Sequence, residues 1–181
     1  PVRLQKAEKL FAAGAYGLAL PEYLGLYREA DPLLNDRLAA IYSAQGELSA
    51  AEKYFEKNLG APAPYAERAV QGLVRAALEQ EDRERVLAQV PALLALRSAD
   101  TGRELLAAAR FLTAQGAHPA ALELLTAFQR RYPDGPRLDQ ALFMLARLFE
   151  LESPLRDVRK ARDYYEKVYT DYPESEYSAE A

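Results

Sequence analysis

The sequence has no cysteine and no tryptophan, and only one histidine and one methionine among 181 residues. Without cysteine the chain offers no disulfide bond, no thiol nucleophile and no thiolate metal ligand, which is compatible with either a reducing or an oxidising compartment. No apolar run approaches the roughly 18 residues that a membrane-spanning helix needs, and no signal-peptide pattern opens the chain. Because the chain begins at Pro1, we expect a mature or trimmed form, so the missing export signal assigns no compartment.

A single histidine leaves little scope for metal or acid–base chemistry. His118 lies beside Pro119, where we expect a turn between two helices. We interpret the acidic cluster Glu81, Asp82 and Glu84 as a solvated turn and first helical turn rather than as metal ligands. No Gly-rich phosphate loop, Ser-centred elbow or pair of catalytic carboxylates occurs. The sequence therefore predicts no catalytic residue, no cofactor and no metal ion.

The residues that are abundant favour helices. Hydrophobic residues make up 50% and charged residues 28% of the chain, and its frequent Ala, Leu, Glu and Arg are good helix formers. The formal net charge of −4 gives the molecule as a whole no electrostatic footprint for nucleic acid. We therefore expect a folded helical protein that does not bind nucleic acid.

Small and apolar residues recur in an order typical of paired amphipathic helices. The best-defined copy runs from Leu105 to Pro133, with a turn at Gly116. Equivalent small residues of the second helices are Ala19, Ala51, Ala121 and Ala161. The interval between the second and third of these leaves room for one more copy, in which Val86 takes the same place.

We therefore predict an all-α fold, a right-handed superhelical solenoid of about five helix-turn-helix hairpins that forms a single domain over residues 1–181. The expected units are 1–31, 32–63, 64–98, 99–134 and 135–174, and residues 175–181 are expected to begin a further, truncated helix. Gly72 weakens the first helix of the third unit, and Pro91 predicts a kink near Gln89. In the fifth unit, an insertion around Pro154 lengthens the turn.

This order of residues resembles the tetratricopeptide repeat, which has small residues in both helices, an aromatic residue late in each and a proline after the second. The resemblance covers nearly the whole chain. The tryptophan that is usual near the start of the first helix is absent from every copy, so the half-a-tetratricopeptide and Sel-type families are alternatives. The resemblance implies a concave face, lined by the first helices, that binds protein segments.

A connector of tyrosine, proline and an acidic residue occurs twice, as Tyr132-Pro133-Asp134 and as Tyr172-Pro173-Glu174. It resembles the connectors of bacterial envelope proteins that include the BamD-type assembly lipoproteins and the YbgF-type periplasmic proteins, although the lipobox cysteine of the former is absent. This resemblance implies a periplasmic or cell-envelope adaptor or assembly factor.

Five arginines take equivalent places in the first helices when the units are aligned on their small residues. Arg75, Arg110 and Arg147 share one position, and Arg68 and Arg103 share another. Two arginines seven residues apart lie on one helical face. We predict a cationic strip that binds the carboxylates of a partner's acidic segment or C-terminus, because a guanidinium can hold a carboxylate through two hydrogen bonds.

A simpler interpretation of these arginines is also open. They would then solvate a helix face and pair with nearby acids such as Glu67, Glu104 and Glu150, in exposed pairs that contribute under about 1 kcal/mol each.

Tyrosines crowd near the end of the chain, and we expect Tyr165 and Tyr169 to pack between layers, while exposed tyrosines would contact a next unit or a partner.

The predicted function is a non-catalytic protein–protein interaction module without a membrane span. Two alternatives are a solenoid that associates with copies of itself and an accessory domain of a larger protein. Because tetratricopeptide solenoids share packing residues and differ in exposed ones, the fold names no partner.

Overall fold

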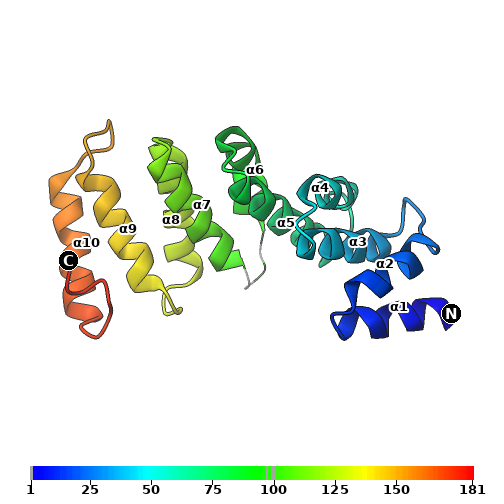
Figure 1. Cartoon of the computed structure of the whole chain (residues 1–181). Helices are drawn as coiled ribbons and strands as arrows, with labels where there is room; N and C mark the ends of the chain where they lie inside the picture. The colour runs from blue at the N-terminus through cyan, green and yellow to red at the C-terminus, as the bar shows by residue number, and fades with distance from the viewer. Residues whose placement is uncertain (1, 97, 99–100) are drawn as a thin grey trace. The chain divides into compact units, whose positions relative to one another are not determined.

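The computed structural model describes residues 2–96, 98 and 101–181, and within them it contains ten α-helices and no β-strand (Figure 1). Their bounds are α1 (Val2–Ala12), α2 (Tyr16–Leu24), α3 (Pro32–Ala44), α4 (Leu48–Lys57), α5 (Tyr65–Glu79), α6 (Arg83–Ala95), α7 (Gly102–Ala114), α8 (His118–Arg131), α9 (Leu138–Glu150) and α10 (Val158–Asp171). The prediction of an all-α chain with five successive pairs of helices is confirmed.

The turns within the helix pairs depend on left-handed backbone. Gly14, Gly46 and Gly116 have φ angles of 71°, 78° and 73°, a conformation that glycine adopts without steric cost. Between α5 and α6 the same role falls to Glu81, whose φ is 52°. Asp82 then accepts a hydrogen bond from the Arg85 backbone N–H, so it caps α6.

The chain forms two compact units, residues 1–80 and residues 81–181, each with its own packed helices. The predicted third repeat, 64–98, is divided between them, because α5 packs against α3 and α4 while α6 packs against α7 and α8. The single continuous solenoid over residues 1–181 stays a prediction.

The first unit packs α1 to α5 around two apolar clusters. One cluster joins the first two helix pairs through Ala7, Ala19, Tyr23, Leu34, Leu38 and Ile41. The other joins α3 and α4 to α5 through Ala39, Ala51, Phe55, Ala69 and Leu73. Stacking of each helix pair on the next therefore supplies the core.

The second unit packs α6 to α10 around large side chains that are fully buried. These are Leu93, Leu105, Leu112, Leu124, Leu125, Leu145 and Leu148. The small residues predicted to mark the second helices of both units are buried as well, and these are Ala19, Ala51, Val86, Ala121 and Ala161. α6 continues through Pro91 to Ala95, and the kink predicted there stays a prediction.

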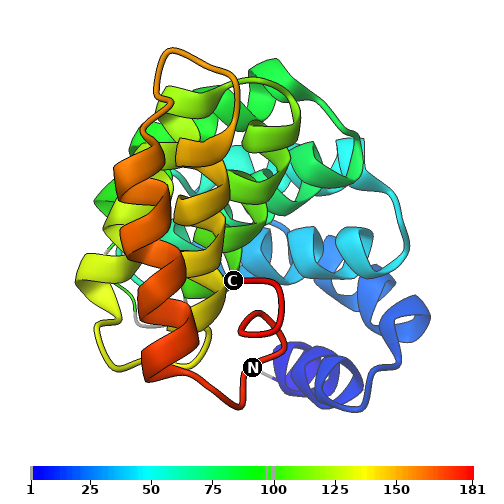
Figure 2. The ribbon, with the colours of Figure 1, turned by 90° about the vertical axis from the view of Figure 1, so that its left-hand side faces the viewer.

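A loop of residues 151–157 separates α9 from α10, where the sequence predicted a lengthened turn around Pro154 (Figure 2). The Asp157 backbone N–H donates to the Phe149 carbonyl at 2.8 Å and closes the loop. The Asp157 side chain accepts from the backbone N–H groups of Arg159 and Lys160, so it caps α10. The lengthened turn that the sequence predicted around Pro154 is therefore confirmed.

The residues after α10 form turns where the sequence predicted the start of a helix at Ser175. The hydrogen bonds of these turns repeat those that follow α8, forty residues earlier. The backbone N–H of Tyr172 donates to the Val168 carbonyl at 3.1 Å, and the backbone N–H of Ala181 donates to the Tyr177 carbonyl at 3.0 Å. The corresponding bonds run from Tyr132 to Phe128 at 2.9 Å and from Ala141 to Arg137 at 3.1 Å, and the second of these lies at the start of α9.

Candidate protein-binding surface

The first unit contains a groove of about 340 Å³ between α3 and α5. We call it the α3/α5 groove. It is lined by Phe11, Asp36, Arg37, Ala40, Ser43, Leu48, Phe55, Arg68, Gly72, Arg75, Ala76 and Glu79. Several of these side chains are small, so the two helices leave room between them.

Gly72 has a packing role that the sequence did not reveal. A Cβ atom at this position would overlap the ring of Phe55, which reaches across from α4 and is 5% exposed. The glycine therefore lets the Phe55 ring lie directly against the backbone of α5. We had expected Gly72 only to weaken the helix, yet α5 runs through it without a break.

A buried carboxylate lies in this groove beneath two arginines. Asp36 is 5% exposed. The Arg68 guanidinium donates from Nε to Asp36 Oδ1 at 2.7 Å and from Nη2 to Oδ2 at 3.0 Å, and Arg37 Nη1 donates to Oδ2 at 3.2 Å. Such a two-point contact is a strong, directional ion pair because both donors are charged and aligned.

The network continues from Arg37 into the first helix pair. Arg37 donates two hydrogen bonds of 3.0 Å to the Glu8 carboxylate, which also accepts a 2.7 Å hydrogen bond from the Tyr23 hydroxyl. The hydrogen bond from Arg37 is the main cause that holds the pKa of the Glu8 carboxyl below its ordinary value. Burial, and then the hydrogen bond to Glu8, raise the pKa of the Tyr23 hydroxyl. One charged network therefore ties α1, α2 and α3 to α5.

The two predicted binding arginines of the first unit have different surroundings. Arg68 is engaged with Asp36, so its guanidinium already holds a carboxylate of its own chain. Arg75 is exposed at the other end of the groove, and its Nε donates to the Gln71 carbonyl at 3.3 Å. The partner of Arg68 lies 32 residues away in the sequence. Charge patterning along one helix therefore could not identify it.

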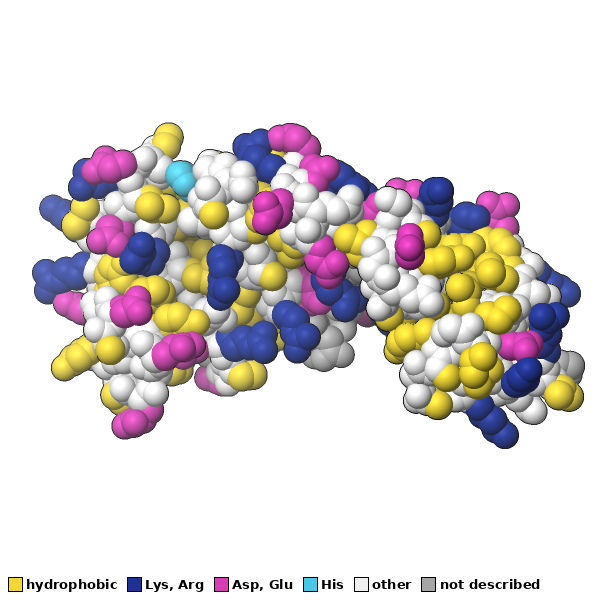
Figure 3. All heavy atoms as spheres, in the orientation of Figure 1, with side chains coloured by type: hydrophobic (Ala, Val, Ile, Leu, Met, Phe, Trp, Pro, Cys, Tyr) yellow, Lys and Arg dark blue, Asp and Glu magenta, His cyan; other side chains and the backbone are white. Residues whose placement is uncertain are grey.

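The three predicted arginines of the second unit lie on first helices. Arg103 and Arg110 are exposed on α7, and Arg147 on α9 has 58% of its side chain exposed. Arg147 lies 3.9 Å from Glu150, one turn further along the helix, which agrees with the simpler interpretation for that pair. Basic side chains are spread over the surface formed by α7 in Figure 3. Whether the five arginines form one strip stays a prediction.

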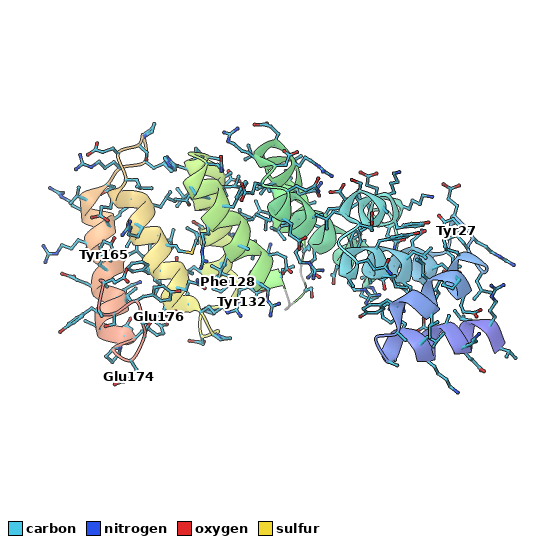
Figure 4. The ribbon with its side chains drawn as sticks, in the orientation of Figure 1. Tyr27, Phe128, Tyr132, Tyr165, Glu174 and Glu176 are labelled. Carbon is cyan, nitrogen blue, oxygen red and sulfur yellow. The ribbon has the colours of Figure 1, made fainter. Side chains whose placement is uncertain are left out.

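Arg103 belongs to a pocket with an aromatic wall. The pocket of about 500 Å³ is also lined by Arg137, Phe128 and Tyr132. The two aromatic rings lie 4.9 Å apart at the end of α8 (Figure 4). Arg137 just precedes α9 and has a φ of 71°. The sequence alone did not single out this second arginine.

The C-terminal tyrosines divide into packed and exposed side chains. Tyr165 and Tyr177 both lie against Phe143 of α9, at ring distances of 5.8 and 5.1 Å. The packing predicted for Tyr165 is therefore confirmed, whereas that predicted for Tyr169 is wrong, because Tyr169 is 66% exposed. Burial, and then the neighbouring Glu176 carboxylate, raise the pKa of the Tyr177 hydroxyl.

No group of three His, Asp or Glu side chains is placed to hold a metal ion within residues 2–96, 98 and 101–181. In the same residues, no helix is long and apolar enough to cross a membrane. His118 begins α8, directly after the turn that contains Gly116. This is the position expected from the sequence.

Comparisons with known proteins agree with this architecture. Residues 140–175 match the family model described as a tetratricopeptide repeat. A curated protein of Borreliella burgdorferi, described as uncharacterized, is 30% identical over 126 residues, which make up 69% of this chain and 36% of that protein. The chain thus spans about a third of this relative.

A solved structure of pilF from Pseudomonas aeruginosa has the same fold. It superposes with a TM-score of 0.66 at 16% sequence identity, and the match covers 98% of this chain and 78% of that one. At this identity the likeness shows the fold alone. Residues 140–175 therefore match a tetratricopeptide repeat, and the chain as a whole has a fold similar to that of pilF.

Proposed function

We propose that this chain is a non-catalytic protein-interaction module that binds a carboxylate-bearing segment of a protein partner on α7 and α9. One observation carries the proposal. Arg103 and Arg110 are both exposed and lie seven residues apart on α7, and Arg147 is exposed on the neighbouring first helix, α9. Two turns of helix separate the first two side chains, so they lie on the same face.

The chain itself illustrates how such an arginine holds a carboxylate. Arg68 binds Asp36 through two nitrogen atoms and both carboxylate oxygens. A partner carboxylate could meet the exposed guanidinium groups of α7 in the same geometry. Arg75 supplies a further exposed guanidinium in the α3/α5 groove, beside Glu79.

We also infer a role as an adaptor or assembly factor in a bacterial envelope. The two connectors of tyrosine, proline and an acidic residue support this role, because they resemble those of bacterial envelope proteins. The two similar proteins described above also come from bacteria. A periplasmic location is part of this proposal.

The test begins with a displayed library of peptides that end in a free C-terminus, selected against the 181-residue chain. We expect the selected peptides to be rich in Asp and Glu or to require the terminal carboxylate. The dissociation constant of the best peptide is then measured by fluorescence anisotropy. Replacing Arg110 and Arg147 together by glutamate should weaken binding at least about tenfold, which corresponds to about 1.4 kcal/mol.

A matched variant carries Arg130→Glu and Arg162→Glu, which make the same change of charge on the second helices α8 and α10. It should change the affinity by less than about twofold, because both arginines lie on second helices outside the proposed contact and exposed charges are screened in physiological salt. Selection of neutral or basic peptides would contradict the proposal, and so would an equal loss in both variants. Circular dichroism checks that both variants remain helical.

A further inference from the structure

The pocket that Arg103 and Arg137 share carries an excess of positive charge. It lies where the start of α7, the end of α8 and the connector into α9 meet, and we call it the Arg103/Arg137 pocket. The Glu104 carboxylate also lines it, so two guanidinium groups against one carboxylate leave a net charge of +1. Within residues 2–96, 98 and 101–181, neither arginine side chain forms an ion pair or a hydrogen bond. An anion of a partner could therefore complete the charge balance of this pocket.

One wall of the pocket is aromatic and firmly held (Figure 4). The Tyr132 ring packs against that of Phe128, and its hydroxyl lies 3.1 Å from the Thr101 hydroxyl. Phe128 is 2% exposed and Tyr132 is partly exposed, so Tyr132 presents the ring that a ligand can reach. Gly102 lies against both rings, because a Cβ atom there would be 3.1 Å from Phe128 and 3.3 Å from Tyr132. An aromatic group of a ligand would meet a fixed ring here, which favours offset or edge-to-face contact.

Arg137 has a backbone conformation in which glycine would be less strained. Its φ of 71° lies in the left-handed region, where a Cβ atom crowds the following carbonyl oxygen. At the turns within helix pairs, Gly14, Gly46 and Gly116 adopt similar φ angles. An arginine at such a position does not stabilise the backbone, so what it contributes is its side chain, which lines the pocket.

We propose that the Arg103/Arg137 pocket binds an acidic residue of the partner segment together with an aromatic residue two positions away, and that Arg137 is a specificity-determining residue for this pair. Arg103 and Arg137 hold the carboxylate, because guanidinium groups donate charged hydrogen bonds to it. Tyr132 contacts the aromatic ring. In an extended segment, side chains two positions apart point to the same side, so both can enter one pocket.

The direction of α7 indicates that the segment continues beyond the pocket. Arg110 follows Arg103 by two turns of α7, which is about 10 Å along a helix. A segment that reaches both arginines spans this distance with about three extended residues. The acidic and aromatic pair therefore lies inside the segment, and binding needs no free chain end. This inference rests on the proposed function and adds which partner residues are selected.

The test uses the peptide Ser-Phe-Ser-Asp-Ser-Gly with an acetylated N-terminus and an amidated C-terminus, so that the aspartate carries its only charge. Nuclear magnetic resonance of the nitrogen-15-labelled 181-residue chain gives the dissociation constant from the backbone amide shifts. We expect the shifts to concentrate at Gly102, Arg103 and Leu138. Replacing the aspartate of the probe by asparagine should weaken binding about tenfold. Replacing its phenylalanine by serine should weaken binding about fivefold.

The substitution Arg137→Gly separates binding from stability. It removes one guanidinium and suits the left-handed backbone, so the affinity for the probe should fall at least about fivefold while the melting temperature stays or rises. Glu81→Gly is the matched control, because Glu81 also has a positive φ, of 52°, and is not among the residues that line the pocket. It should change the affinity by less than about twofold. Arg103→Gln, at an exposed position of α7, should weaken binding as Arg137→Gly does.

Three results would overturn the proposal. One is an equal affinity for all three peptides, which would mean that neither the carboxylate nor the aromatic ring is recognised. Another is a set of amide shifts that avoids the start of α7 and of α9. The third is an unchanged affinity in both Arg137→Gly and Arg103→Gln.

A second copy of the chain is the competing occupant, because Tyr172 and Glu174 also lie two positions apart. In this chain they belong to a turn rather than to an extended segment. Light scattering on the 181-residue chain tests the alternative. A dimer that Arg137→Gly converts to monomer would show that another copy fills the pocket and would overturn the proposal, whereas a monomer agrees with it.

The short probe also distinguishes this inference from the proposed function. The variant with Arg110→Glu and Arg147→Glu should bind the probe as the unmodified chain does, because neither residue is among those that line the pocket. If the probe binds but the display selection yields no acidic peptide, the proposed function fails. If acidic peptides are selected but the probe does not bind, this inference alone fails.

Discussion

At the scale of single residues, a missing methyl group shapes one wall of the α3/α5 groove. Gly72 leaves the space that the Phe55 ring occupies. By helix propensity alone, alanine would be favoured over glycine here by about 1 kcal/mol. The contact with Phe55 has the opposite effect on stability, since the added carbon of alanine forces a buried ring to move at a cost of about 1–3 kcal/mol.

We therefore predict that Gly72→Ala lowers the free energy of unfolding by about 1 kcal/mol, the difference between overpacking and propensity. Urea denaturation followed by circular dichroism measures it. Gly17→Ala is the matched control, because a Cβ on Gly17 of α2 meets no atom within 4 Å. That substitution should stabilise the chain by about 0.5 kcal/mol. An increase in stability for Gly72→Ala would show that Phe55 moves aside at little cost.

The buried Asp36 marks the limit of prediction at this scale. The sequence identified Arg68 and Arg75 as members of one helical face, and both do line the same groove. It could not show that Arg68 donates hydrogen bonds from Nε and Nη2 to the Asp36 carboxylate, because this contact joins α3 to α5. Local periodicity describes one helix at a time, whereas ion pairs between helices depend on how the helices pack.

At the scale of helices, α1 is held to the first unit by charge as well as by apolar contacts. Glu8 is the link, and its carboxyl has a lowered pKa chiefly because Arg37 donates hydrogen bonds to it. A carboxyl with a lowered pKa in the folded state stabilises the fold at neutral pH. That contribution is lost as the pH falls from the unfolded pKa through the folded one.

We therefore expect the free energy of unfolding to fall as the pH is lowered from about 5 to about 3, with part of the fall due to Glu8. In a Glu8→Gln variant this part is absent, so the curve of stability against pH is flatter over the same range. Glu56→Gln, at an exposed position of α4 outside this network, should keep the slope of the unmodified chain. Identical slopes for Glu8→Gln and Glu56→Gln would rule out the Glu8 contribution.

Helix positions were more predictable than helix partners. Gly116 lies at the turn that the sequence indicated, and Gly14 and Gly46 have the same left-handed backbone, which favours glycine. The kink that Pro91 predicts stays a prediction, and α6 continues through this residue to Ala95. Tyr169 was predicted to pack and is instead exposed, because the burial of a residue on α10 depends on the helix beside it rather than on its own spacing.

At the scale of the whole chain, the division into two compact units determines how far the effect of a destabilising substitution extends along the chain. In a repeat protein each helix pair contacts mainly its neighbours, so stability is approximately a sum of local contributions. Leu38 is fully buried in the first unit and Leu125 in the second. Matched substitutions at these two sites compare the units.

Leu125→Ala should cost about 2–5 kcal/mol, and Leu38→Ala a similar amount. We predict that Leu125→Ala accelerates amide exchange in α7 to α10 while α3 and α4 keep their rates, and that Leu38→Ala produces the reverse pattern. Hydrogen-exchange mass spectrometry on both variants measures the pattern. Uniform acceleration throughout the chain for either variant would mean that the units unfold as one.

The seven-residue loop between α9 and α10 shows where this chain accepts additional length. The other helix pairs turn within three residues, yet the longer loop leaves Ala161 buried in its repeat position. Lengthening a surface loop costs little conformational entropy. The tips of the helix pairs are therefore natural insertion points for an epitope or a fluorescent label, placed away from the faces on which the helices stack.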